Sequence, residues 1–195
     1  MPDLLAYRLE VQRKLIHISS SSIAILLWYY GKDAFMPWIL AISIIFPIFD
    51  YLRKNIPLLK RVYITLFGAI TRPYEYEILS GASWVFIGSC ISVYLFNENV
   101  AIIAILVMSL SDSAAAIIGI KFGKTRLFNK SLEGTLAFLI SAFVIIHILS
   151  PAPLVLTLIT AISVSIIELI SIPSLNDNLL IPILTGIILT VGGVY

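Results

Sequence analysis

The sequence predicts an all-α, polytopic membrane protein, and three observations support this prediction. Hydrophobic residues make up 59% of the 195-residue chain and charged residues only 12%. The mean hydropathy is +1.02, far above that of a soluble domain. The apolar residues also form continuous runs of about 17–25 residues, the length that an α-helix needs to cross a bilayer. A membrane β-barrel would instead show alternating polarity in shorter segments.

Seven such runs follow one another, and we expect each to be a membrane-spanning helix. They cover approximately residues 15–31, 35–51, 78–96, 100–120, 134–150, 153–171 and 179–195. The first run has a basic flank like that of a secretory signal, but WYYGKDAF follows it in place of a small-residue cleavage site. We therefore expect an uncleaved first helix and one integral membrane domain over residues 1–195.

The basic residues predict the orientation of the helices. If the N-terminus is cytoplasmic and all seven helices cross, the cytoplasmic segments are 1–14, 52–77, 121–133 and 172–178. These segments contain 12 of the 13 Lys and Arg residues, and only Lys32 lies outside them. Because Lys and Arg are enriched in cytoplasmic loops, we expect the N-terminus on the cytoplasmic side of the cell membrane and the C-terminus on the outer side.

The long segment 52–77 is expected to contain an amphipathic element near residues 58–71. Its uncharged part, Val62–Thr71, is too short to span a bilayer. A helix in the membrane interface would place this part in the apolar layer and Lys60 and Arg61 beside lipid phosphates. A re-entrant or partly buried segment is the alternative.

The densest group of polar residues lies between Ser109 and Thr135 and includes one acid, Asp112, within an otherwise apolar run. An ionisable side chain at membrane depth is costly and therefore indicates a functional site. Proteins bind Mg²⁺ through one or two carboxylates together with substrate phosphates, and glycine N–H groups can hold phosphate oxygens. Lys124 and Lys130 are near enough in sequence to converge with Asp112. An acid followed by glycines and lysines thus predicts a metal-bound phosphate. A stripe of small residues for helix packing and a structural Asp–Lys pair are the alternatives.

Other polar residues are expected at the same cytoplasmic end of the helices. They are Arg13, Lys14 and His17 near the first helix, Arg72, Glu75 and Glu77 before the third, Glu168 at the end of the sixth, and Asn176, Asp177 and Asn178 before the seventh. One cytoplasm-facing polar site explains this common placement better than independent structural roles. Cys90 and His147 are expected to have no part in it.

The ordered segments RKLIH, RPYEYEILSGAS, SLSDSAAAIIGIKFG, NKSLEGT and E-x(8)-DNLLIP resemble the family of dolichol kinases, phytol kinases and CTP-dependent diacylglycerol kinases. The resemblance covers about residues 13–182. It implies an integral membrane enzyme that phosphorylates a lipid alcohol with CTP and a divalent metal, Mg²⁺. The core from Asp112 to Gly134 is also similar to CDP-diacylglycerol synthases.

The resemblance implies a role for each matching residue. The residues expected to bind the nucleotide are Arg13, Lys14, Gly119, Gly123, Lys124, Lys130 and Gly134. The expected metal ligands are Asp112, Glu133 and Asp177. Asp112 or Glu168 is expected to be the general base, with His17 as the alternative.

A CTP-dependent lipid alcohol kinase is therefore the leading hypothesis. The alternatives are a phosphatidate cytidylyltransferase and a small membrane transporter that catalyses no reaction. The expected partners are CTP and a membrane lipid alcohol, and the net charge of +2 is too small to predict nucleic-acid binding. The identity of the lipid and the oligomeric state, including a homodimer, stay open.

Overall fold

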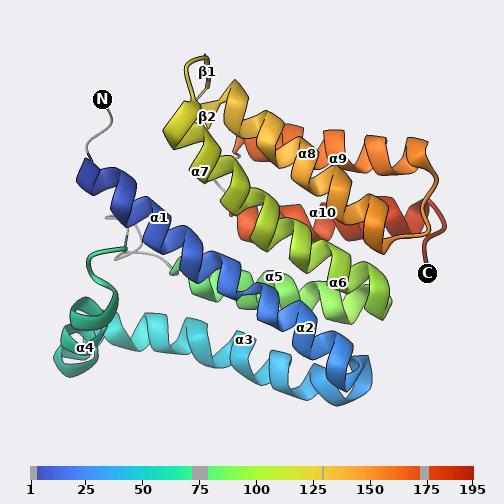
Figure 1. Cartoon of the computed structure of the whole chain (residues 1–195). Coiled ribbons are helices and arrows are strands. Elements are labelled where there is room, and N and C mark those ends of the chain that lie inside the picture. The colour runs from blue at the N-terminus through green and yellow to red at the C-terminus, as the bar shows by residue number, and fades with distance from the viewer. Residues whose placement is uncertain (1–3, 72–78, 129, 172–175) are drawn as a thin grey trace.

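A computed structural model describes residues 4–71, 79–128, 130–171 and 176–195. This part of the chain is mostly helical, and its helices lie side by side in an elongated bundle (Figure 1). The segment containing Arg72, Glu75 and Glu77 lies outside the described residues.

The first expected span is divided into two helices, α1 (Leu4–Ser19) and α2 (Ser21–Tyr30). The hydroxyl groups of Ser19 and Ser20 donate to backbone carbonyls three residues earlier, both at 2.6 Å. Such local bonds from serine compete with the regular helical pattern and bend or end a helix. The continuous apolar run hid this break, because serine in a membrane helix does not lower the hydropathy enough to signal it.

Gly31 then turns the chain into α3 (Lys32–Asn55). Its φ of +76° lies in the left-handed region that glycine adopts without strain. Next comes α4 (Pro57–Phe67), which starts at a proline, a residue suited to a first helical turn. It occupies the expected amphipathic segment and exposes Leu58, Val62 and Leu66 while burying Tyr63.

The next helix is α5 (Gly81–Leu95), which packs along α3. After it, α6 (Glu98–Leu106), the π-helical turn η2 (Val107–Ser111) and α7 (Asp112–Phe122) form one continuous helix. This helix runs through the middle of the molecule and contacts α1, α2, α8 and α10 (Figure 1). Its residues Val100, Ile105, Val107 and Met108 are completely buried and form the centre of the apolar core.

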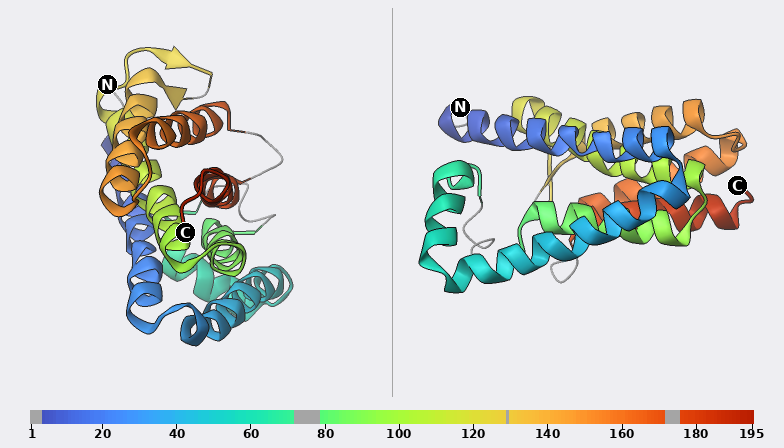
Figure 2. Two further views of the ribbon diagram at one scale, coloured as in Figure 1. Left: turned by 90° about the vertical axis from the view of Figure 1, so that its right-hand side faces the viewer. Right: turned by 90° about the horizontal axis from the view of Figure 1, so that it is seen from below.

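Two short antiparallel strands, β1 (Arg126–Leu127) and β2 (Lys130–Ser131), follow α7 and pair Arg126 with Ser131. The chain continues in α8 (Leu132–Leu149), α9 (Leu154–Ile170) and α10 (Asp177–Val191). Helix α8 packs between α7 and α9, and α10 contacts α5, α6 and α9. The hairpin, the start of α1 and α4 lie toward one end of the bundle, and the C-terminus lies at the other (Figure 2).

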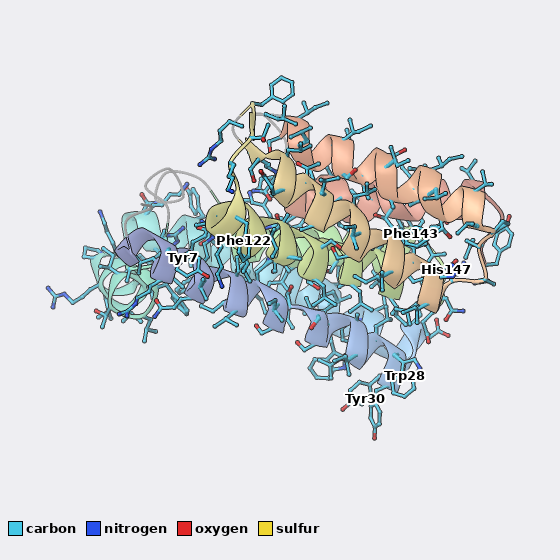
Figure 3. The ribbon with its side chains drawn as sticks, turned by 45° about the horizontal axis from the view of Figure 1, so that its top comes forward. Tyr7, Trp28, Tyr30, Phe122, Phe143 and His147 are labelled. Carbon is cyan, nitrogen blue, oxygen red and sulfur yellow. The ribbon has the colours of Figure 1, made fainter. Side chains whose placement is uncertain are left out.

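The described residues are consistent with the expected all-α membrane protein, because the two strands contribute only four of these residues and several of the helices are strongly apolar. In the described part, Lys32–Asn55, Glu98–Phe122 and Leu132–Leu149 are long and apolar enough to cross a membrane. Gly81–Leu95, Leu154–Ile170 and Asp177–Val191 are shorter apolar helices. Large apolar side chains are exposed around the bundle, and Trp28 and Tyr30 project outward from the end of α2 (Figure 3). The count of seven spans and the orientation stay predictions.

Candidate active site

The candidate site begins where η2 ends, at Asp112. A π-helical turn inserts one residue into an α-helix, shifts the side chains that follow it and occurs often at functional sites. Here η2 directly precedes Asp112, and most of its side chains are completely buried. The turn therefore fixes the direction in which the carboxylate leaves the central helix.

Asp112 is paired with residues of α1, which packs against α7. The Nζ atom of Lys14 donates a short hydrogen bond to Asp112 Oδ2. The Nε2 atom of His17 lies 3.3 Å from the same oxygen and 3.3 Å from the carbonyl oxygen of Met108. Lys14 is buried, so the pairing compensates two charges that are both removed from solvent. The sequence suggested Lys124 or Lys130 as partners of Asp112, and the structure places Lys14 there.

A second charged group surrounds Lys130 on β2. Its ammonium donates to Glu168 Oε1 at 2.7 Å, to Asp177 Oδ2 at 3.2 Å and to the backbone carbonyl of Glu168. Ser171, at the end of α9, also donates to Asp177 Oδ2, at 3.1 Å. Burial disfavours the charged ammonium, but the two carboxylates outweigh burial and raise the pKa of Lys130 above its ordinary value. Lys130 is therefore a cation at neutral pH.

Glu168 carries one oxygen whose hydrogen-bonding capacity is unused. Only 3% of the residue is exposed, and its Oε2 atom has no hydrogen-bond partner among the described residues. Buried polar atoms are nearly always paired, so an unpaired one calls for an explanation. Glu168 is one of the residues that line a cavity, and a substrate proton or a cation that reached its Oε2 atom would satisfy this oxygen.

This cavity has a volume of about 1300 Å³ and joins both charged groups. Nine of the twelve site residues expected from the sequence line it, namely Arg13, Lys14, His17, Asp112, Gly119, Lys130, Gly134, Glu168 and Asp177. The other three, Gly123, Lys124 and Glu133, do not line it. Side chains from both ends of the sequence thus converge on one space, as the common placement of polar residues predicted.

The three glycines lie where α7 meets α8. A Cβ atom on Gly134 would stand 2.8 Å from the backbone oxygen of Ala115, and one on Gly123 would stand 2.7 Å from Ser131 Cβ. The N–H of Gly134 is donated to Ser131 Oγ, and that of Gly123 to the carbonyl of Gly119. Both N–H groups are therefore used within the protein. The geometry fits the packing alternative for these glycines better than direct phosphate binding.

Lys124 and Glu133 lie beside the hairpin. Lys124 is exposed, and both carboxylate oxygens of Glu133 accept from the backbone N–H of Thr125, at 3.2 and 3.4 Å. Within the described residues, no three His, Cys, Asp or Glu side chains are close enough together to hold a metal ion. The expected metal ligands Asp112, Glu133 and Asp177 therefore do not form one three-residue metal site in the described part of the chain.

Sequence reasoning missed a third polar cluster, centred on the buried Asp50 of α3. Its Oδ2 atom accepts from the backbone N–H and hydroxyl of Ser80, both at 2.7 Å, and from the Ser83 hydroxyl at 2.6 Å. Its Oδ1 atom accepts from Arg53 Nε at 2.7 Å, and the Arg53 guanidinium lies 3.8 Å from the centre of the Tyr63 ring. The cluster joins α3, α4 and the start of α5 at the cavity wall. The rule that identified Asp112, an acid in an apolar run, also applies to Asp50.

Comparison with known proteins gives relatives over most of the chain. The sequence is 35% identical to CTP-dependent diacylglycerol kinase 1 of Saccharomyces cerevisiae over 134 residues, which are 66% of this chain and 46% of the yeast protein. It is 33% identical to an uncharacterised protein of Methanocaldococcus jannaschii, with 92% of each chain covered. It is 27% identical to phytol kinase of Synechocystis, over 70% of this chain and 57% of that protein. No protein-family model and no solved structure matches the chain.

These relatives and the apolar helical bundle define the class as an integral membrane protein related to lipid kinases. The chain belongs to the polyprenol and lipid kinase family, which includes CTP-dependent diacylglycerol kinase, dolichol kinase and phytol kinase. It spans about half the length of the yeast diacylglycerol kinase that it matches.

Proposed function

We propose that this protein is a CTP-dependent kinase that transfers the γ-phosphoryl group of the nucleotide to the hydroxyl of a membrane lipid. The observation that carries the proposal is the single cavity that joins the Lys14–Asp112 and Lys130–Glu168 groups to an apolar wall. Its volume of about 1300 Å³ exceeds the roughly 300–1,000 Å³ of a pocket for one small ligand. Two substrates would therefore meet in it and react directly.

Lys14 and Lys130 are the groups proposed to hold the phosphates, with Arg13 beside them. A lysine ammonium has three N–H donors, and Lys130 already uses three acceptors. To bind a phosphate oxygen, Lys130 has to release one of them. The 3.2 Å bond to Asp177 is the longest of the three, so we infer that Asp177 is the partner exchanged. Its carboxylate then becomes available for a cation.

The charges lining the cavity support a divalent cation as part of this site. The lining contains four cations, Arg13, Lys14, Arg126 and Lys130, and four carboxylates besides the Arg53-paired Asp50, namely Glu10, Asp112, Glu168 and Asp177. These charges balance, so the added charge of a triphosphate has no counterpart in the lining. Asp177 and Asp112 would hold Mg²⁺, which binds through one or two carboxylates and substrate phosphates. When bound, Mg²⁺ would neutralise the charge that develops on the phosphate oxygens.

A base is needed for the proton of the lipid hydroxyl. Asp112 already accepts from Lys14 and lies beside His17, whereas Glu168 Oε2 is buried and unpaired. We therefore assign the proton acceptor to Glu168 in preference to Asp112 and His17. The hydroxyl oxygen would attack the γ-phosphorus, the bond between the γ-phosphorus and the bridging oxygen would break, and CDP would leave.

The test is a product analysis with purified protein in detergent micelles. CTP labelled at the γ-phosphorus is expected to label the lipid fraction when diacylglycerol, a polyprenol or phytol is supplied, with release of CDP. CTP labelled at the α-phosphorus is expected to leave the lipid unlabelled. Lipid labelled only from α-labelled CTP, with phosphatidate as acceptor and pyrophosphate as product, would contradict the kinase and favour a cytidylyltransferase.

A further inference from the structure

The cavity extends from the charged groups along its apolar wall. We call this part of the cavity the apolar limb. Its walls are formed by residues of α1, α2, α3 and α5, and their apolar side chains include Ile16, Ile23, Phe46, Phe49, Val85 and Phe86. The rings of Phe46 and Phe86 are in contact, with centroids 4.5 Å apart. Asp50 also borders this limb, but Arg53, Ser80 and Ser83 satisfy its carboxylate. The limb therefore offers apolar surface and no unpaired charge from Asp50.

The limb lies where two arms of the fold separate. Helix α2 contacts α3 near their turn at Gly31, but α1 packs against α7 and η2 whereas α3 packs against α5 and α4. The α1–α2 arm and α3 therefore diverge from the turn, and α4 lies across the wide end (Figure 2, right). The break at Ser20 lies on the cavity wall, so the change of direction between α1 and α2 occurs beside the limb.

Some of the residues that line the limb between these arms also have large exposed fractions. Two of its lining side chains are also substantially exposed, Ile16 at 52% and Phe46 at 37%. Their neighbours on the outside, Leu15, Ile45 and Ile48, are exposed apolar residues as well. An apolar surface of this kind on a membrane protein faces lipid chains.

We propose that this limb, between α1–α2 on one side and α3 on the other, binds the apolar chain of the lipid alcohol and admits it sideways from the bilayer. The proposal rests on the kinase function proposed above. His17 and Ile23 are six residues apart, so the limb runs roughly 9 Å along the helices from the charged groups, at 1.5 Å per residue. A lipid lying in it places its hydroxyl near Glu168 and Lys130 and leaves most of its chain in the membrane.

Cross-linking tests the occupant without requiring catalysis. Phe46 is replaced by the photoreactive residue p-benzoylphenylalanine, and Ile45, an exposed neighbour on α3 outside the cavity lining, is replaced in the matched control. Each protein is placed in phosphatidylcholine nanodiscs without nucleotide, with tritiated dioleoylglycerol in one arm and a tritiated C20 prenyl alcohol in the other. We expect at least one of the two tritiated lipids to label position 46. An excess of the same lipid without tritium should prevent this labelling, whereas it should not prevent labelling at position 45. The proposal would be overturned if excess unlabelled lipid failed to reduce the labelling of position 46 by either tritiated lipid.

A kinetic test uses Ser22, which lines the limb from α2, and Ile25, an exposed residue of the same helix outside the lining. Ser22→Trp fills the limb and is expected to raise KM for the lipid alcohol about tenfold or more, the scale on which apolar pockets discriminate by size. The Ser22→Trp enzyme is expected to keep its KM for CTP. The Ile25→Trp enzyme is expected to keep both its KM for CTP and its KM for the lipid alcohol. An unaltered lipid KM in Ser22→Trp would overturn the proposal.

The two tests separate this inference from the kinase function. Displaceable labelling at position 46 in a protein that transfers no phosphoryl group would support the limb and contradict the kinase. Phosphoryl transfer without displaceable labelling and with an unaltered Ser22→Trp enzyme would support the kinase and contradict the limb. The probe that is displaced at position 46 identifies whether an acyl or a prenyl chain occupies it.

Discussion

The sequence assigns Lys124 and Lys130 the same role in binding the nucleotide, but the structure places them in different surroundings. Comparing replacements of the two lysines therefore tests whether Lys130 alone binds phosphate. Lys130 lies between Glu168 and Asp177 inside the cavity, and Lys124 is exposed outside its lining. A charge-assisted hydrogen bond is worth about 1.5–3 kcal/mol. Lys130→Met should therefore lower kcat/KM for CTP roughly 10- to 100-fold, since each 1.4 kcal/mol is a factor of ten. Lys124→Met should leave it nearly unchanged.

The same substitution should also reduce stability, and this effect has to be separated from catalysis. The side chain of Glu168 is only 4% exposed, so Lys130→Met leaves a buried carboxylate without its cation. Breaking a fully buried pair costs about 3–5 kcal/mol, and the 25% exposure of the Lys130 side chain reduces this penalty. Converting the carboxylate to an amide in Lys130→Met/Glu168→Gln removes the uncompensated charge. We expect the double variant to recover thermal stability in micelles but not activity.

Both quantities can be measured on the same purified samples. Steady-state kinetics with varied CTP gives kcat/KM, and a thermal unfolding scan in the same micelles gives the apparent Tm. The reasoning would be refuted if Lys124→Met and Lys130→Met lowered kcat/KM equally. It would also be refuted if the double variant regained activity together with stability, because the lysine would then be structural.

Three further predictions concern the other polar clusters and the topology. Asp112→Asn should abolish activity while the protein still inserts and purifies, because the near-isosteric amide is a poor ligand for a hard cation; full turnover at limiting Mg²⁺ would exclude a role in metal binding. Asp50→Asn removes the buried charge that accepts hydrogen bonds from Arg53, Ser80 and Ser83 and should destabilise the protein by about 3–5 kcal/mol, whereas Asp33→Asn, at an exposed position of the same helix, should cost less than about 1 kcal/mol; equal Tm values would contradict this. The third variant replaces Lys124 by cysteine in a chain whose native Cys90 is replaced by serine. This cysteine should not react with an impermeant thiol reagent applied to intact cells, because the basic residues predict a cytoplasmic hairpin. Ready labelling from outside would contradict the predicted orientation.

The sequence predicted the helical runs and singled out many of the residues that line the cavity, since both depend on local properties of the chain. Hydropathy over a window identifies an apolar helix wherever it packs, and the cost of an ionisable group in such a helix identified Asp112. The break at Ser20 escaped this reasoning because it depends on two serine hydroxyls bonding to nearby carbonyls, and hydropathy carries no information on that geometry.

The partners within the site were harder to predict, because they depend on long-range packing. Lys14 and Asp112 are separated by 98 positions and meet only because α1 packs against α7. The sequence argument favoured Lys124 and Lys130 because they are near Asp112 along the chain. The π-helical turn before Asp112 also has no sequence signal, although it changes which side chains face α1. Proximity in sequence was therefore a poor guide to pairing.

The pairing in the structure also explains how a polyanion can enter a site rich in carboxylates. The two lysines of the site are each matched by acids, Lys14 by Asp112 and Lys130 by Glu168 and Asp177, so neither lysine is an isolated charge away from water. Under the proposed function, binding would be an exchange: a phosphate oxygen would replace Asp177 at Lys130, and the released carboxylate would be able to hold the cation that accompanies the phosphate. The net charge of the site changes little in this exchange. Glu168 keeps its bond to Lys130 through Oε1 while Oε2 stays free, so the same residue can hold the lysine in place and accept the proton of the lipid hydroxyl.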